Sequence, residues 1–582
     1  MLGIALLVAC GAWQGSGEEL GAACMDCHGE LVEAWRASPM GRALRPLAAA
    51  ELADLAPVAD PRTGFRYALE RRGERGFVVE EWLGPDGRSV AEARNEAELA
   101  FAIGAGVADT SYAALRGGRW WFAPLEVLSA SATAPRHAVF APGQMTKPGL
   151  RLDVAISDEC LACHTDALPP ERFPSNLAPS SAWTPRGPDC GHCHPAAAAH
   201  AEHQSSNATG PDPIVAAALR TPIERVSSCA RCHLQGDARV PLANDPSLAR
   251  APGGDLLAKL AVFTGSDANG EIPFVSQTER MVESVCFTAS LAREGRALTC
   301  ETCHDPHRSV FETRERERVR AACTRCHASD EAAVLGRDAP CSEPLARRAT
   351  KACVDCHARR TAPFDVADVE IFDHKIERKP LAPSKLAAIR VKQSRGGELK
   401  RFRWPGRPVP LDGDPGLELL GLVGADQAER ALALVDAKPD AAVERLAIYH
   451  HTRGGLLESA RRFEDARKAY LRAKLLDAGS AATRINLGLV LAQCGKASDG
   501  LAELDAVVRE HPASDGALRN RALVKLALGD AAGARADLEA AHALLASAAT
   551  ARGLAEIARR ENDRAAHERW LAAARALDPV GR

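Results

Sequence analysis

Aromatic side chains are scarce in this 582-residue chain: Phe, Trp and Tyr together make up 4% of it. That share is thin for the core of a chain long enough to hold more than one domain. Beyond the N-terminus, the sequence lacks the ~20 consecutive apolar residues of a membrane-spanning helix. The net charge is −3, so the composition indicates neither a strongly basic face for nucleic acid nor an acidic disordered tail.

Cysteine and histidine, by contrast, recur in one pattern. Cys-x-x-Cys-His occurs seven times and accounts for 14 of the 18 cysteines. It is the attachment site of c-type haem, in which both thiols bond to the porphyrin and the histidine becomes an axial iron ligand. We therefore predict seven covalent haem c groups, attached through Cys24, Cys27, Cys160, Cys163, Cys190, Cys193, Cys229, Cys232, Cys300, Cys303, Cys323, Cys326, Cys353 and Cys356. The predicted proximal iron ligands are His28, His164, His194, His233, His304, His327 and His357.

Zinc sites and redox dithiols are the alternatives for a Cys-x-x-Cys pair. Zinc ribbons combine two such units and need no histidine directly after the second cysteine. A thioredoxin-like dithiol would occur once, near a βαβ pattern. Seven copies that all end in histidine favour haem over both alternatives. Large, flat haem groups would also supply apolar surface that the scarce aromatic residues do not.

The second axial ligand decides what each haem does. A histidine or methionine closes the iron and favours electron transfer, whereas an open position lets a substrate bind. His307 follows its motif as Cys303-His304-Asp305-Pro306-His307, where proline stiffens the turn and can aim the imidazole at a neighbouring haem. The predicted distal ligands are His200, His307, His374 and Met40. His137, His192 and His203 are weaker candidates, for which an ordinary surface histidine is the alternative.

The apolar start of the chain ends in Leu7-Val8-Ala9-Cys10, which looks like a bacterial lipobox. We expect an exported protein, either periplasmic or associated with the outer membrane or cell surface, with Cys10 as a candidate lipid anchor. A cleaved signal peptide without an anchor and a plain apolar end are the alternatives. Cys286 and Cys341 belong to no motif; in an oxidising compartment they could pair, and buried free thiols are the alternative.

Composition divides the chain into four segments. Residues 1–17 form the signal-like or lipoprotein-like segment, and residues 18–380 form the heptahaem domain. Within that domain, residues 60–150 carry no motif and alternate apolar with polar residues between turn signals, so we predict a small β-rich insert with Trp120 and Trp121 in a strand core. Residues 381–415 form a basic linker that contains proline, interpreted as a solvated connector or a docking strip for an acidic partner.

The C-terminal segment, residues 416–582, is internally repetitive. Gly454, Gly488 and Ala522 recur at a constant spacing, and small residues there would let paired helices approach closely. The spacing matches the tetratricopeptide repeat, whose units stack into a curved solenoid with a concave binding face. A plain helical cap on the haem domain is the alternative. The predicted fold class is therefore mainly α: a multihaem cytochrome c domain with little regular structure and a small β-rich insert, followed by an α-helical repeat solenoid.

Further stretches carry a family resemblance: Ser284-Val285-Cys286-Phe287, the run Leu298–His307, Ser38-Pro39-Met40 and Asp373-His374-Lys375-Ile376. In these the chain resembles bacterial multihaem cytochromes c related to the cytochrome c554 group, in the subset fused to tetratricopeptide repeats. The resemblance covers residues from about 20 to 580. It implies an exported electron-transfer protein with distal ligands at His200, His307 and His374. The chain departs from the family pattern after His194 and after His357, where Pro195–Ala199 and Ala358–Arg360 replace Gly-Pro-Gly and Met-Pro-Arg.

The leading hypothesis is an exported heptahaem c-type cytochrome that carries electrons between redox protein partners, with the repeats as a docking domain for a protein. The alternative is a multihaem oxidoreductase that acts on small nitrogen or sulfur compounds at an open haem. Every motif keeps histidine, and none has the Cys-x-x-Cys-Lys form that marks one class of catalytic haem. This favours a carrier over an enzyme. A third class is a scaffold in which the repeats alone carry the function.

Overall fold

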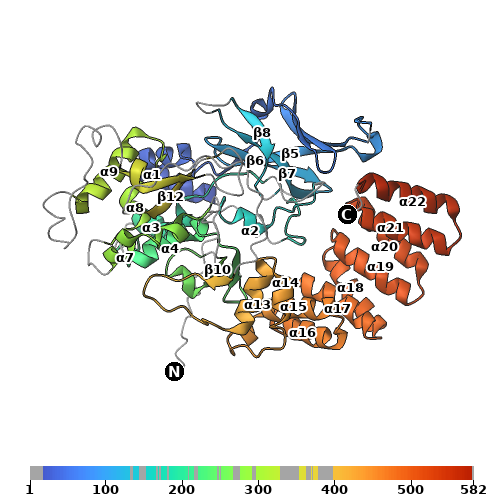
Figure 1. Cartoon of the computed structure of the whole chain (residues 1–582). Helices are drawn as coiled ribbons and strands as arrows, with labels where there is room; N and C mark the ends of the chain where they lie inside the picture. Colours follow the sequence, from blue (N-terminus) through green and yellow to red (C-terminus); the bar gives the residue numbers. More distant parts are fainter. Residues whose placement is uncertain are drawn as a thin grey trace.

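The computed structural model describes residues 17–579 except 85, 131–134, 143, 145–151, 166–167, 169–171, 180–182, 207–208, 215–219, 246–247, 249–250, 266–274, 292–296, 328–352, 362–368, 370 and 378–397. A helix with the first motif leads into an antiparallel sheet, which is followed by short helices that carry the other motifs and by a C-terminal helical stack (Figure 1). Cys10, Cys341 and residues 381–397 of the expected linker lie outside the described residues. None of the described helices is long and apolar enough to cross a membrane.

The largest element is an eight-stranded antiparallel sheet between residues 44 and 140. Seven strands are hydrogen-bonded in chain order from β2 to β8, and β1 pairs with the C-terminal end of β5. β2 and β8 approach each other, so the sheet nearly closes on itself. The strands are β1 (Leu44–Pro46), β2 (Val58–Asp60), β3 (Phe65–Arg72), β4 (Arg75–Trp82), β5 (Asn95–Ile103), β6 (Asp109–Arg116), β7 (Arg119–Leu128) and β8 (His137–Phe140).

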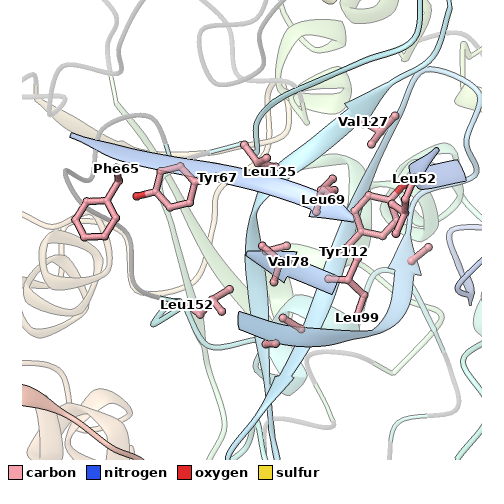
Figure 2. Packing of buried hydrophobic residues seen from close by; sticks show 14 residues of the cluster. Leu52, Phe65, Tyr67, Leu69, Val78, Leu99, Tyr112, Leu125, Val127 and Leu152 are labelled. Carbon is pink, nitrogen blue, oxygen red and sulfur yellow. The ribbon is translucent and has the colours of Figure 1, made fainter. Parts of the chain in front are cut away.

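Alternation along the strands gives the sheet a buried inner face. In β3, Phe65, Tyr67 and Leu69 are buried while Arg66 between them is exposed, because successive side chains of a strand point to opposite faces. Figure 2 shows the resulting core, in which side chains from β3, β4, β5, β6 and β7 meet. Trp120 and Trp121 of β7 are buried as well.

The prediction of a mainly α fold with a small β-rich insert is wrong. The sheet has eight strands, begins before residue 60 and nearly closes. The insert was underestimated because β5 contains several Ala and Glu residues (Asn-Glu-Ala-Glu-Leu-Ala-Phe-Ala-Ile) and β6 contains two Ala residues. Ala and Glu have little strand preference of their own. These segments become strands because partners on both sides pair with them.

The motif-bearing region consists of short helices and two small sheets. One sheet has the order β13-β10-β9 and the other pairs β11 with β12. Phe402 and Trp404 follow β13 and are buried in the core beneath β10, so the described part of the expected linker packs onto this region. The elements are α1 (Gly17–Ala37), α2 (Asp158–Leu161), η3 (Cys190–His192), α3 (Ala197–Ser205), α4 (Pro222–His233), β9 (Ala238–Pro241), β10 (Leu260–Gly265), α6 (Gln277–Met281), α7 (Val285–Leu291), α8 (Cys300–Cys303), α9 (Thr313–His327), α12 (Val354–His357), β11 (Ala358–Thr361), β12 (Ile371–Ile376) and β13 (Leu399–Arg401).

The C-terminal stack consists of antiparallel helix pairs. The first helices of four successive pairs, α15, α17, α19 and α21, begin at regular intervals that match the tetratricopeptide period. A Cβ atom on Gly454 would lie 2.7 Å from the Tyr470 ring, and one on Gly488 would lie 2.6 Å from Leu504. The predicted small positions are therefore where paired helices touch. The helices are α13 (Pro415–Gly424), α14 (Ala428–Leu432), α15 (Ala447–Ser459), α16 (Phe463–Leu476), α17 (Ala481–Gln493), α18 (Ala497–Glu510), α19 (Asp515–Ala527), α20 (Ala531–Leu544), α21 (Ala548–Arg560) and α22 (Arg564–Leu577).

Both ends of the stack contact the rest of the chain (Figure 1). At its start, α13 packs on β9 and β10, where Gly421 lies against the Phe263 ring. Towards its end, the turn between β6 and β7 reaches the loops that join α18 to α19 and α20 to α21. α22 also lies beside the short helix η2 (Ala91–Ala93), next to the sheet. The stack is therefore anchored at two places.

The β6–β7 turn holds the stack through two arginines. The Arg116 guanidinium donates to the carbonyl of Ala546 at 2.9 Å, and that of Arg119 donates to the carbonyl of Ala513 at 2.7 Å. Arg119 also forms an ion pair with Asp515 at 2.7 Å, and the two side chains are only 5% and 11% exposed. Removing one member of a buried pair leaves the other charge without compensation, so this contact fixes the position of the repeats.

Replacing Gly117 by alanine tests this docking. Gly117 and Gly118 have φ values of 58° and 67°, so alanine strains the turn similarly at either position. At Gly117, however, the added Cβ atom would collide with the carbonyl oxygen of Leu544, whereas the space around Gly118 is open. We expect Gly117→Ala to lower the opening free energy of the amides of residues 544–548 by about 1.5–3 kcal/mol, the scale of a hydrogen bond to a charged group. Native-state hydrogen exchange measures this quantity.

Gly118→Ala is the matched control and should leave these amides protected. An equal loss of protection in both variants would show that strain in the turn, and not contact with the repeats, is responsible.

Candidate functional site

Each motif occupies a helical turn or its end. Residues three apart lie on the same side of a helix, so the two thiols of a motif point the same way and the histidine follows at the edge of the turn. In α1 the backbone leaves helical geometry at His28, where φ is −122°. α4 and α9 end at the motif histidines His233 and His327. All seven motifs lie within described residues.

Thiols of different motifs lie side by side. Each cysteine would bond to the edge of its own porphyrin, so adjacent thiols indicate adjacent cofactor sites. Burial and then the neighbouring Cys24 raise the pKa of the Cys190 thiol to about 12. The adjacent pairs are Cys24 with Cys190, Cys163 with Cys232, Cys229 with Cys300 and Cys323 with Cys353.

Three motif histidines face three of the predicted distal histidines. A metal–imidazole nitrogen bond is about 2 Å long and the ring centre lies about 1.1 Å behind that nitrogen, so two axial imidazoles on one iron have centres about 6.2 Å apart. The observed gaps fit an iron with two axial histidines. The ring centres are 6.2 Å apart for His28 and His200, 6.1 Å for His194 and His307, and 6.3 Å for His304 and His374.

These pairs connect alternate motifs. The histidine that follows the third motif faces the first motif, the one after the fifth faces the third, and the one after the seventh faces the fifth. Each distal candidate therefore comes from the segment behind the motif two places further along the chain. The interleaving joins the odd-numbered motifs into one continuous series.

Six of the motif and paired distal histidines form a hydrogen bond through their second ring nitrogen, Nδ1. A hydrogen bond from Nδ1 fixes the ring and leaves Nε2 as the nitrogen available to a metal, which is the usual arrangement around metal-bound histidine. His28, His194 and His327 have no such bond among the described residues, and Nδ1 of His304 is buried there without a partner. Nδ1 donates to the Asp212 carboxylate in His200 (2.8 Å), to Asp305 in His307 (3.2 Å), to the carbonyl of Phe372 in His374 (3.0 Å), to that of Ala43 in His164 (3.2 Å), to the side chain of Gln277 in His233 (3.3 Å) and to the carbonyl of Glu377 in His357 (2.8 Å).

Burial keeps several of these imidazoles neutral. It lowers the pKa of His194 and of His304 below the ordinary value. Burial, followed by the neighbouring His304, lowers the pKa of His374 to about 4. Neutral imidazole is the form that coordinates a metal, because protonation blocks the ligating nitrogen. These three rings are therefore in the ligating form at neutral pH.

The strand β12 presents His374 between two apolar side chains. Phe372 and Ile376 lie on the same strand face as His374, since they are two residues away on either side. They are 38% and 36% exposed, although large apolar side chains are more often covered. A flat apolar group beside His374 would cover them. The opposite face is held by Asp373, whose two carboxylate oxygens accept hydrogen bonds from Arg280 at 3.0 and 2.9 Å.

The other predicted ligands are not brought into such pairs. Met40 lies in the turn after α1 and is 37% exposed. His137 is on β8 and donates to the carbonyl of Pro135, while Nε2 of His192 lies 3.7 Å from the Cys232 thiol. His203 is on α3, one turn beyond His200. Within the described residues, no second imidazole faces the four remaining motif histidines in this way; these are His164, His233, His327 and His357.

Sequence analysis missed the residues that hold the predicted distal ligands in place. Asp212 lies twelve residues after His200 across a loop, and no spacing rule connects the two. The only sequence signal is its place in Pro211-Asp212-Pro213, where two prolines stiffen the backbone. Hydrogen bonds, first from the backbone of Ile214, lower the pKa of Asp212 to about 2. Cys286 lies close to Cys303; its pairing with Cys341 stays a prediction, because Cys341 is outside the described residues.

Comparison with known proteins bears on two parts of the chain. The family described as "Doubled CXXCH motif" matches residues 292–332, which include the fifth and sixth motifs. This doubled motif points to covalently bound haem c and to a multihaem c-type cytochrome. A search of curated proteins finds no match.

Three solved structures that are similar to this chain each match 29% of it. MamA 41-end from Desulfovibrio magneticus RS-1 is 17% identical, with 98% of that chain covered and a TM-score of 0.26. YrrB, a TPR protein with an unusual peptide-binding site, is 17% identical, with 86% covered and a TM-score of 0.24. TTC0263, a thermophilic TPR protein in Thermus thermophilus, is 17% identical, with 91% covered and a TM-score of 0.25.

Replacing Asp373 by alanine tests how β12 is held. The change removes the bidentate partner of Arg280, which is 17% exposed, and leaves the ion pair with Glu283. We expect the opening free energy of the β12 amides to fall by about 3 kcal/mol, the lower end of the range for removing one member of a buried ion pair. Native-state hydrogen exchange of residues 371–376 measures it.

Glu377→Ala is the matched control, because Glu377 forms a longer, exposed ion pair with Lys375 at 3.9 Å. That change should cost about 1 kcal/mol or less. Similar losses in the two variants would contradict a specific role for the Asp373 pair.

Proposed function

We propose that the chain is an exported heptahaem c-type cytochrome that carries electrons between redox protein partners. The observation that carries this proposal is the set of three imidazole pairs, each with the gap that an axially coordinated iron requires. Haem c, when bound, supplies reversible one-electron chemistry. The doubled Cys-x-x-Cys-His match and the seven motifs in the sequence support the count.

The cysteine and histidine side chains would have different roles at each site. The two motif cysteines would hold the porphyrin by thioether bonds, and the motif histidine would occupy one axial position of the iron. At three sites His200, His307 or His374 would occupy the other. Closing both axial positions excludes a substrate there and favours electron transfer over catalysis. We propose Met40 as the distal ligand at a further site.

The C-terminal repeats are proposed to bind a protein partner. Stacked helix pairs generally present an extended concave surface to a partner. Anchoring at both ends would hold that surface at a constant position relative to the motifs. We also propose a relation to the cytochrome c554 group, export to the periplasm or to the outer membrane or cell surface, and a lipid anchor at Cys10.

Haem content and ligation test the proposal directly. Pyridine haemochrome analysis of the mature protein should give seven haems per chain. His307→Ala should convert one low-spin centre to high spin without loss of haem, because the thioether bonds remain, and low-temperature electron paramagnetic resonance detects the change. His450→Ala, in α15 of the repeats, is the control and should leave the spectrum unchanged. A colourless protein, or a spectrum that His307→Ala does not alter, would contradict the assignment.

An oxidoreductase that acts on small nitrogen or sulfur compounds is the second candidate. It is favoured by the four motif histidines that no second imidazole faces within the described residues, among them His164 and His233. An open axial position there would make a high-spin centre. We expect the resting protein to be low-spin throughout if it is only a carrier; a high-spin signal that disappears on addition of nitrite or carbon monoxide would support the enzyme instead.

A further inference from the structure

Asp212 contacts the predicted distal ligand His200 through both carboxylate oxygens and accepts two further hydrogen bonds. Both carboxylate oxygens lie 2.8 Å from Nδ1 of His200. The Gln204 side chain donates to Oδ2 at 2.8 Å, and the backbone N–H of Ile214 donates to Oδ1 at 2.9 Å. Four contacts therefore fix one carboxylate against the back of the imidazole. Nothing in the motif pattern requires an acidic residue at this place.

The other two paired distal histidines have weaker acceptors. Nδ1 of His307 lies 3.2 Å from a single oxygen of Asp305, which also accepts the backbone N–H of His307. Nδ1 of His374 donates to the neutral carbonyl of Phe372 at 3.0 Å. In order of decreasing strength, the acceptors are the Asp212 carboxylate at His200, the shared Asp305 oxygen at His307 and the uncharged carbonyl at His374.

This ranking has a consequence for electron affinity. A negatively charged acceptor on Nδ1 draws the proton away from the ring and raises the basicity of Nε2. A more basic axial ligand stabilises ferric over ferrous iron, so it lowers the reduction potential. The acceptors on the three distal histidines should therefore order the potentials of the three sites.

The solvent exposure of the sites should shift their reduction potentials in the same order as the hydrogen bonds do. His28 and Cys27, on the motif side of the His200 pair, are exposed, whereas His304 and His374 are half-buried. Burial disfavours the more highly charged oxidised state and raises the potential of a haem site. Solvent at the first site and burial at the fifth would widen the difference that the hydrogen bonds create.

We propose that Asp212 is a positioning residue which, through His200, gives the His28–His200 site the lowest reduction potential of the three histidine-pair sites, with the His304–His374 site the highest. The inference rests on the proposed function, because it requires haem iron between these rings. It adds a role for Asp212 and an order of potentials that the motifs themselves do not contain.

The test is a redox titration of the full-length haem-loaded protein and of Asp212→Asn. Asparagine keeps the shape and an acceptor oxygen but removes the charge. We expect the lowest midpoint potential to rise by about 59 mV or more, equivalent to a tenfold change in a one-electron equilibrium, while the other midpoints stay in place. Asp212→Glu keeps the negative charge, so its lowest midpoint potential should stay close to that of the unmodified protein. Asp305→Asn should move a different and higher midpoint by a smaller amount.

Glu202→Gln is the matched control, because Glu202 is an exposed carboxylate on the same helix, two residues from His200. A shift as large as that of Asp212→Asn would mean that general charge near the site is responsible, and it would overturn the inference. An unchanged lowest midpoint in Asp212→Asn would overturn it as well. His200→Ala tests the ligand pair separately from the role of Asp212. If His200→Ala produces a high-spin centre while Asp212→Asn has no effect, the His28–His200 pair is supported and the role of Asp212 is refuted. If His200→Ala changes no spin state, the pairing itself fails.

Discussion

The nearly constant gap between facing imidazoles is the constraint on which the rest of the motif region depends. The paired rings come from elements far apart in sequence, such as α8 and β12, yet the ring centres are 6.2, 6.1 and 6.3 Å apart in the three pairs. The hydrogen bonds at Nδ1 fix the direction of each distal ring. Haem iron bound between each pair, as proposed above, would hold the rings at this distance.

The sheet and the repeats provide the rigid frame around it. The carbonyl of Ala43, which enters β1, accepts hydrogen bonds from His164 and from the backbone of Gly104 at the end of β5, so the second motif is tied to the sheet. The indole of Trp35 in α1 donates to the carbonyl of Pro188 beside the third motif. With the repeats anchored on β10 and on the β6–β7 turn, the chain returns to the sheet where it began. Such an arrangement limits movement between the parts more than a flexible linker would.

Short-range sequence patterns pointed to residues that the structure brings together, whereas the predicted fold class was wrong; the ligand assignment itself stays a prediction. The seven motifs, the histidine after Pro306 and the regular spacing of the repeats are short-range patterns, and the structure places His307 and the helix pairs accordingly. The sheet was underestimated because Ala-rich strands such as β5 become strands only through their neighbours, which a single sequence does not show. Asp212 and the Arg280–Asp373 pair were missed for the same reason: their partners are 12 and 93 residues apart, and no spacing rule predicts a contact across a loop.

If the paired histidines bind iron as proposed, their interleaving makes each of these odd-numbered sites depend on a later segment of the chain. No odd-numbered site that has a histidine pair is complete within its own segment, because its second imidazole arrives from behind the motif two places further on. Coordination of a metal by residues that are distant in sequence couples binding to folding. An early site would therefore stay open until the later segment has folded against it. Independent motif units joined by linkers would lack this dependence, because each could close with its own histidine. The order of the segments along the chain would thus set the order in which second axial ligands bind. The site of the fifth motif would be completed only when β12 brings His374 to it.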